Sequence, residues 1–100
     1  MTNGDNIYLV ATLKAHSGKA GELRQRLEEI IPAVRREPGC ISYDLHSDRN
    51  DPDVLVMLET WESGAALDAH GNAPPFQSLQ PHFEHLLAEP LTLQLLSRIA

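Results

Sequence analysis

The order in which two hydrophobic periodicities alternate along the chain constrains its fold more than any other feature of the sequence. Segments with the alternating, β-branched pattern of strands occupy 7–15, 40–48, 53–62 and 91–96. Segments with apolar residues three and four positions apart, as in helices, occupy 20–34, 64–69 and 76–87. This order predicts an α+β, ferredoxin-like βαββαβ domain with a four-stranded antiparallel sheet and the helices on one of its faces.

Length and charge limit the classes of protein to which this chain can belong. A chain of 100 residues without a linker, a repeat or a low-complexity segment is expected to form one domain spanning 1–100, with its core between about 7 and 98. The formal net charge of −6 opposes binding to a phosphate backbone, so nucleic acid is not an expected partner. Because the sequence shows neither a membrane-spanning apolar run nor a signal-peptide pattern, we expect an intact cytoplasmic protein that does not bind membranes.

The third predicted strand is apolar on both of its faces. Alternation places Leu55, Met57 and Trp61 on one face and Val54, Val56 and Leu58 on the other. Helices can cover one face of the sheet, and the remaining apolar face is larger than a soluble monomer normally exposes. The pattern therefore predicts a homodimer in which sheet packs on sheet, without deciding which strand face forms the contact.

The sequence lacks the motifs that hold common cofactors and metals. Gly18 and Gly21 have neither the third glycine nor the preceding context of a dinucleotide-binding loop. Cys40 is the single cysteine, which excludes an internal disulfide and a site with several cysteine ligands. His82 and His85 lie one helical turn apart but have no third ligand at a suitable spacing, so surface histidines are the better interpretation. We predict no cofactor and no metal.

Glu59 and His70 are the candidate catalytic residues. Alternation places Glu59 beside Trp61 on an apolar strand face, where desolvation would raise the pKa of the carboxyl and suit it to proton transfer. The competing interpretation is a carboxylate at a strand end that makes a salt bridge or reaches solvent. His70 ends the predicted short helix and could accept a proton from an acidic phenol or enol, although a helix C-terminus also favours a purely structural imidazolium.

Aromatic residues near these two positions could form a flat slot for an aromatic ligand. Trp61, Tyr43, Phe76 and Phe83 are the candidate walls, and Tyr43 or His46 could supply a hydrogen bond. For Phe76 and Phe83, their helical spacing equally fits ordinary core packing.

The order and spacing of several short motifs resemble one known family over almost the whole chain. These motifs are Glu37-Pro-Gly-Cys40, Tyr43-Asp44, Asp51-Pro52, Glu59-Thr-Trp61-Glu-Ser63, His70 and Pro75-Phe76. Together they resemble the antibiotic biosynthesis monooxygenase domain family. Haem-degrading members carry an asparagine on the first strand, and the segment Leu9–Leu13 here holds none.

The resemblance implies a dimeric α+β barrel and a monooxygenase that uses no cofactor. Such enzymes oxidise quinols or polycyclic phenols with dioxygen, because an electron-rich phenolate can itself reduce oxygen while the protein deprotonates it, orients it and excludes water. Two alternatives stay open: an acid–base isomerase of a small metabolite and a non-catalytic dimer that binds a small molecule. The segment Val54–Phe83 contains no Lys or Arg, which favours an uncharged aromatic or phenolic ligand.

Overall fold

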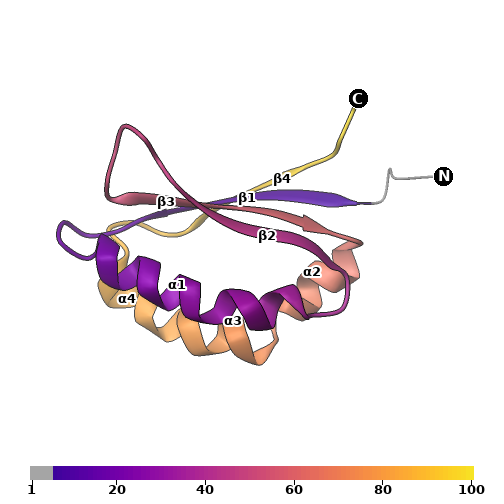
Figure 1. Cartoon of the computed structure of the whole chain (residues 1–100), viewed down its shortest axis with the longest axis horizontal. Coiled ribbons are helices and arrows are strands. Elements are labelled where there is room, and N and C mark those ends of the chain that lie inside the picture. The colour runs from indigo at the N-terminus through magenta and orange to yellow at the C-terminus, as the bar shows by residue number, and fades with distance from the viewer. Residues whose placement is uncertain (1–5) are drawn as a thin grey trace.

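Residues 6–100 are described by a computed structural model (Figure 1). Its strands are β1 (Ile7–Lys14), β2 (Cys40–Ser47), β3 (Val54–Trp61) and β4 (Thr92–Leu96). Its helices are α1 (Ala20–Arg35), α2 (Gly64–Gly71), α3 (Pro74–Leu79) and α4 (Phe83–Leu86), with the 3-10 turn η2 (Gln80–His82) between the last two. The strands form one antiparallel sheet in the order β2-β3-β1-β4, which confirms the predicted fold class.

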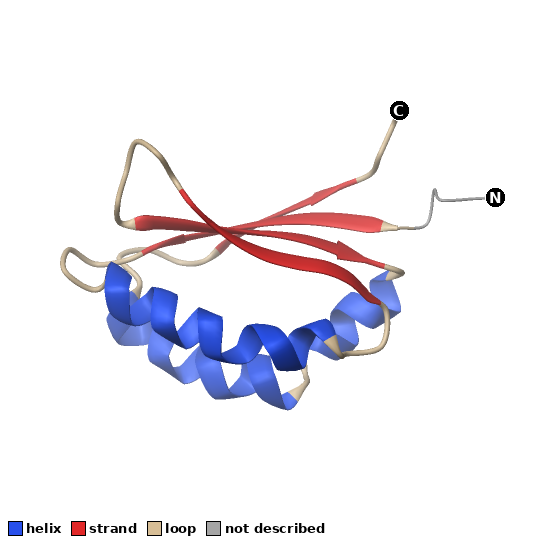
Figure 2. Ribbon diagram, viewed as in Figure 1, coloured by secondary structure: helices blue, strands red, loops and turns tan. Residues whose placement is uncertain are grey.

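The domain has two layers, a twisted sheet and a layer of helices beneath one of its faces (Figure 2). The core lies between the layers, where the apolar stripe of α1 packs with the inner face of β1 and β3. The stripe consists of Leu23, Leu27, Ile30, Ile31 and Val34, all buried. Within residues 6–100, no helix is both long and apolar enough to cross a membrane.

The alternation predicted for β3 is present. Leu55, Met57 and Trp61 are buried on the helix side, whereas Val54 and Val56 are half-buried on the open face. Leu58, on the same open face, keeps 42% of its surface exposed. One chain therefore leaves an apolar sheet face uncovered, and the homodimer stays a prediction.

The helical segment predicted over 76–87 is interrupted. Pro81 has no backbone N–H to donate, so the α-helical hydrogen-bond series stops and the chain passes through η2 before α4 begins. In contrast, α2 runs two residues further than predicted, to Gly71. Ser63 caps the start of this helix: its Oγ accepts a hydrogen bond of 3.1 Å from the Ala66 N–H.

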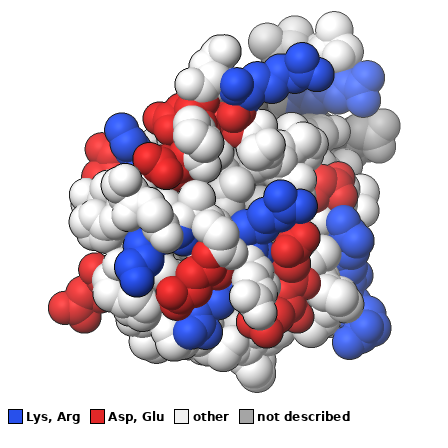
Figure 3. Space-filling view, turned by 60° about the vertical axis from the view of Figure 1, so that its left-hand side comes forward, with Lys and Arg blue, Asp and Glu red and all other residues white. Residues whose placement is uncertain are grey.

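Charged side chains of both signs are interspersed on the face of the molecule shown in Figure 3. On the exposed side of α1, Arg26 pairs with Glu22 at 3.2 Å and Arg24 pairs with Glu28 at 3.5 Å, each one helical turn apart. This face therefore offers no concentrated positive surface to a polyanion.

Candidate functional site

A cavity of about 640 Å³ lies between the helix side of the sheet and the helices that follow β3. Most of its lining is apolar and comes from β1, β3, β4, α1 and the segment 67–91. The apolar residues are Leu9, Ala11, Leu13, Leu27, Met57, Leu67, Phe76, Leu79, Phe83, Leu91, Leu93 and Leu95. The polar side chains are Tyr43, Glu59, Asp68, His70 and Asn72. This size and this mixture are typical of sites for small organic molecules.

The cavity is least covered along β4, the edge strand beside β1. Leu93 and Leu95 pair in register with Ala11 and Leu9, so their side chains point to the helix side of the sheet. They nevertheless remain 54% and 58% exposed, so the side chains of the helix layer leave this edge of the sheet largely uncovered. The apolar lining of the cavity is therefore exposed to solvent along β4.

Glu59 is buried at the inner face of β3, with 6% of its surface exposed. Its Oε1 accepts a hydrogen bond of 2.9 Å from Trp61 Nε1, two residues along the same strand face. Burial raises the pKa of Glu59 to about 7; the Trp61 hydrogen bond opposes this rise, and the negative charge of Glu37 adds to it. Near neutral pH this carboxyl can therefore either give up or take a proton.

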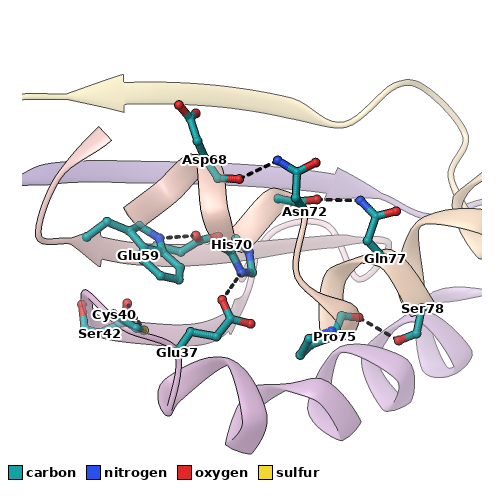
Figure 4. A network of polar contacts seen from close by, with 12 residues as sticks. Glu37, Cys40, Ser42, Glu59, Asp68, His70, Asn72, Pro75, Gln77 and Ser78 are labelled. Atoms are coloured by element: carbon teal, nitrogen blue, oxygen red, sulfur yellow. Dashed lines mark hydrogen bonds and ion pairs between the residues drawn. The ribbon is translucent and has the colours of Figure 1, made fainter. Parts of the chain in front are cut away.

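His70 lies near the end of α2 and is likewise 6% exposed. Its Nδ1 is 2.9 Å from Glu37 Oε1, and Figure 4 shows the two side chains pointing toward each other from α2 and from the turn after α1. The Trp61 ring stacks on the imidazole, with centroids 4.7 Å apart and planes 28° apart. Phe76 lies near the imidazole at a centroid distance of 5.6 Å. The ring is thus held by a carboxylate at one nitrogen and by aromatic neighbours.

Tyr43 connects the two candidate catalytic residues. It is the cross-strand partner of Glu59, and its ring meets His70 edge-on at 5.5 Å. Burial raises the pKa of the Tyr43 phenol, and the nearby negative charges of Glu59 and Glu37 raise it further. The phenol therefore stays neutral near pH 7 and can donate a hydrogen bond.

The fold brings five of the seven predicted site residues to the cavity: Glu59, His70, Tyr43, Phe76 and Phe83. Trp61 does not line it; the indole is fully buried, hydrogen-bonded to Glu59 and stacked on His70. His46 lies elsewhere. It pairs with Val56, so it belongs to the open face of the sheet, and it is exposed.

Glu37 contacts the site without having been predicted as part of it. In the sequence, Glu37 is distinctive only as the first residue of the Glu-Pro-Gly-Cys run. It lies 33 residues before His70, and no periodicity or spacing connects two positions so far apart. Asp68 in α2 and Asn72, the residue that follows this helix, also line the cavity and were not predicted, although each lies only two residues from His70.

Metal-binding side chains do not gather into a site: among residues 6–100 no group of three or more His, Cys, Asp or Glu side chains could hold a metal ion. The rings of His82 and His85 lie 5.7 Å apart, and His85 Nε2 is 3.5 Å from Glu22 Oε2 at a largely exposed position.

Known proteins resemble this chain in sequence and in fold. Residues 6–82 match the sequence model of the antibiotic biosynthesis monooxygenase family. The crystal structure of PA3566 from Pseudomonas aeruginosa superimposes with a TM-score of 0.92 at 34% identity, covering 100% of both chains.

Two curated relatives add to this. The protein sll1783 of Synechocystis sp. is 31% identical over 91 residues, which are 91% of this chain and 62% of that protein. The chain thus spans less than two thirds of the length of this relative. The "Probable quinol monooxygenase YgiN" of Escherichia coli is 39% identical over 54 residues, which cover 46% of this chain and 52% of that one. With the family model matching most of its length, this chain belongs to the antibiotic biosynthesis monooxygenase family.

Proposed function

We propose that this protein is a monooxygenase that oxidises a quinol or a related phenolic molecule with dioxygen, without a metal or an organic cofactor. The observation that carries the proposal is His70, a buried imidazole held by a carboxylate at the wall of an apolar cavity of about 640 Å³. The family, and the name of the YgiN relative as a probable quinol monooxygenase, support the reaction class and the substrate class.

His70 is the group that takes the phenolic proton. Its Nδ1 is occupied by Glu37, and among residues 6–100 no side chain or backbone group hydrogen-bonds to its Nε2. An imidazole nitrogen with a free lone pair is the usual proton acceptor near neutral pH. The resulting phenolate is electron-rich enough to pass electrons directly to dioxygen.

The reaction needs no external reductant. One oxygen atom enters an aromatic C–H bond to give C–OH, and the quinol ring is oxidised to a quinone. The second oxygen atom leaves as water. The substrate supplies all four electrons that reduce dioxygen, two from the quinol and two from the C–H bond. The proton held on His70 is returned when the O–O bond breaks.

Glu59 and Tyr43 serve as the second proton carrier and as a hydrogen-bond donor. With a pKa of about 7, the Glu59 carboxyl can exchange the second quinol proton. The neutral Tyr43 phenol can donate to a substrate oxygen and thereby orient the ring.

The charge of the lining favours a neutral ligand. The described residues that line the cavity include Glu59 and Asp68 but no Lys or Arg. A phosphorylated or carboxylated substrate would meet like charges without a cationic anchor. A phenol that enters neutral and loses its proton inside the cavity avoids that cost.

Oxygen consumption tests the proposal. Metal-stripped protein is mixed with a panel of quinols and naphthols, and oxygen uptake is compared with the protein-free rate and with a His70→Ala variant. We expect protein-dependent uptake that is lost in the variant, and labelling with ¹⁸O₂ should place one heavy atom in the product and one in water. Substrate turnover without oxygen uptake would instead favour the acid–base isomerase, and ligand binding without turnover would favour the binding protein.

A further inference from the structure

The two carboxylate oxygens of Glu37 have different surroundings. Oε1 lies 2.9 Å from His70 Nδ1, whereas Oε2 is buried and has no hydrogen-bond partner among residues 6–100. The Glu37 side chain is 13% exposed and the His70 side chain 7%. A buried polar atom without a partner lowers the stability of the fold, so folding stability alone gives little reason to keep a glutamate here.

The turn that carries Glu37 is fixed in place by backbone contacts. The Glu37 N–H donates to Val34 O at 2.9 Å, and Gly39 O accepts the Glu62 N–H at 2.8 Å. Gly39 adopts a φ of +83°, and a Cβ added to it would lie 2.5 Å from the Ala66 Cβ on α2. The turn therefore packs directly against the helix that carries His70.

We propose that Glu37 is a positioning residue that holds His70 in the Nδ1–H tautomer and so leaves the lone pair on Nε2. A carboxylate can only accept hydrogen bonds, so the contact at Nδ1 requires a proton there. A neutral imidazole carries one ring proton, which makes Nε2 the basic nitrogen. For the reaction this inference rests on the proposed function, but the tautomer itself can be measured without a substrate.

Glu37 also has a consequence for charge. When His70 takes a proton from a substrate it becomes an imidazolium, and a carboxylate 2.9 Å away stabilises that charge in surroundings from which water is largely excluded. A neutral amide at position 37 would occupy the same volume without this effect. The Trp61 ring, stacked on the imidazole, keeps the ring plane in place for the transfer.

Nitrogen NMR of the histidine rings tests the tautomer directly. Full-length protein with ¹⁵N-labelled histidine is studied at a pH where the rings are neutral, and a His70→Ala spectrum identifies the signals of His70. We expect a protonated Nδ1 and an unprotonated Nε2 in the wild type. In Glu37→Gln, whose amide can donate as well as accept, we expect a mixture of tautomers.

The matched control is Glu62→Gln. Glu62 is exposed and lies beside the same turn, but makes no hydrogen bond to His70. This control should keep the wild-type spectrum. A wild-type ring protonated at Nε2, or a Glu37→Gln spectrum identical to the wild type, would overturn the proposal. The wild-type spectrum decides the question even if Glu37→Gln fails to fold.

Kinetics separate this inference from the proposed function. With a quinol that the wild type oxidises, Glu37→Gln should lower kcat at least about 10-fold with little change in KM, because Glu37 does not line the cavity. A mixture of His70 tautomers in Glu37→Gln together with an unchanged kcat would refute the positioning role. If no quinol is oxidised at all, the proposed function fails, while the spectra still decide whether Glu37 sets the tautomer.

Discussion

Replacing Glu59 by glutamine should make the protein more stable at alkaline pH. The buried carboxyl has its pKa raised by desolvation from an ordinary 4.5 to about 7. Glutamine has nearly the same volume, and its amide oxygen can still accept the 2.9 Å hydrogen bond from Trp61. The substitution therefore removes the cost of ionising a buried group and leaves the packing intact.

The direction follows from proton binding. Below about pH 4.5 the carboxyl is protonated in both the folded and the unfolded chain, so it contributes no pH dependence. Between 4.5 and about 7 the unfolded chain loses this proton while the folded chain keeps it, so the free energy of unfolding falls as the pH rises. Above about pH 7 the folded chain bears the full cost of ionising the buried Glu59 carboxyl. The difference between the two pKa values corresponds to about 3 kcal/mol.

Urea denaturation from pH 4 to 8.5, at one fixed protein concentration, measures this effect. The informative quantity is the free energy of unfolding of Glu59→Gln minus that of the wild type, since the other titrating groups cancel. We expect a difference near zero at pH 4 that grows to about 3 kcal/mol in favour of glutamine at pH 8.5. Glu62→Gln, at an exposed position, should show a flat difference. A flat or falling difference for Glu59→Gln would refute the reasoning.

Three further predictions concern the site, the turn and the open sheet face. His70→Ala should lower turnover per folded molecule by a factor of about 10² to 10⁴. Because the ring is buried, the substitution should also lower the free energy of unfolding by about 1–3 kcal/mol. Unchanged turnover would show that His70 takes no part in the chemistry. Gly39→Ala should lower the Tm more than Gly18→Ala. Both glycines have a φ of +83°, but only at Gly39 would the new Cβ meet Ala66. Equal shifts in Tm would argue against this close approach. We also expect light scattering to give twice the mass of one chain for the wild type. Leu58→Lys, on the open face of the sheet, should break the dimer. A stable monomeric wild type would contradict the sheet-to-sheet contact.

Local sequence patterns were enough to predict the order of the elements and the two faces of β3. These features are local: side-chain direction alternates along a strand and repeats about every 3.6 residues along a helix, whatever the rest of the chain does. For the same reason Glu59 and Trp61, two residues apart, could be placed on one buried face, where they hydrogen-bond. The interruption of the helix at Pro81 is also a local effect, but the helical spacing of the apolar residues in 76–87 led to the prediction of one continuous helix.

The way in which these residues come together as a site depends on long-range packing. The β2–β3 register places Tyr43 opposite Glu59 and turns His46 to the other face of the sheet. The packing of the turn after α1 against α2 brings Glu37 to His70 across 33 residues. Such contacts depend on strand pairing and helix docking between distant segments, which no local periodicity encodes. The chemical groups could therefore be found along the sequence, whereas the pairing that gives His70 its carboxylate partner required the folded chain.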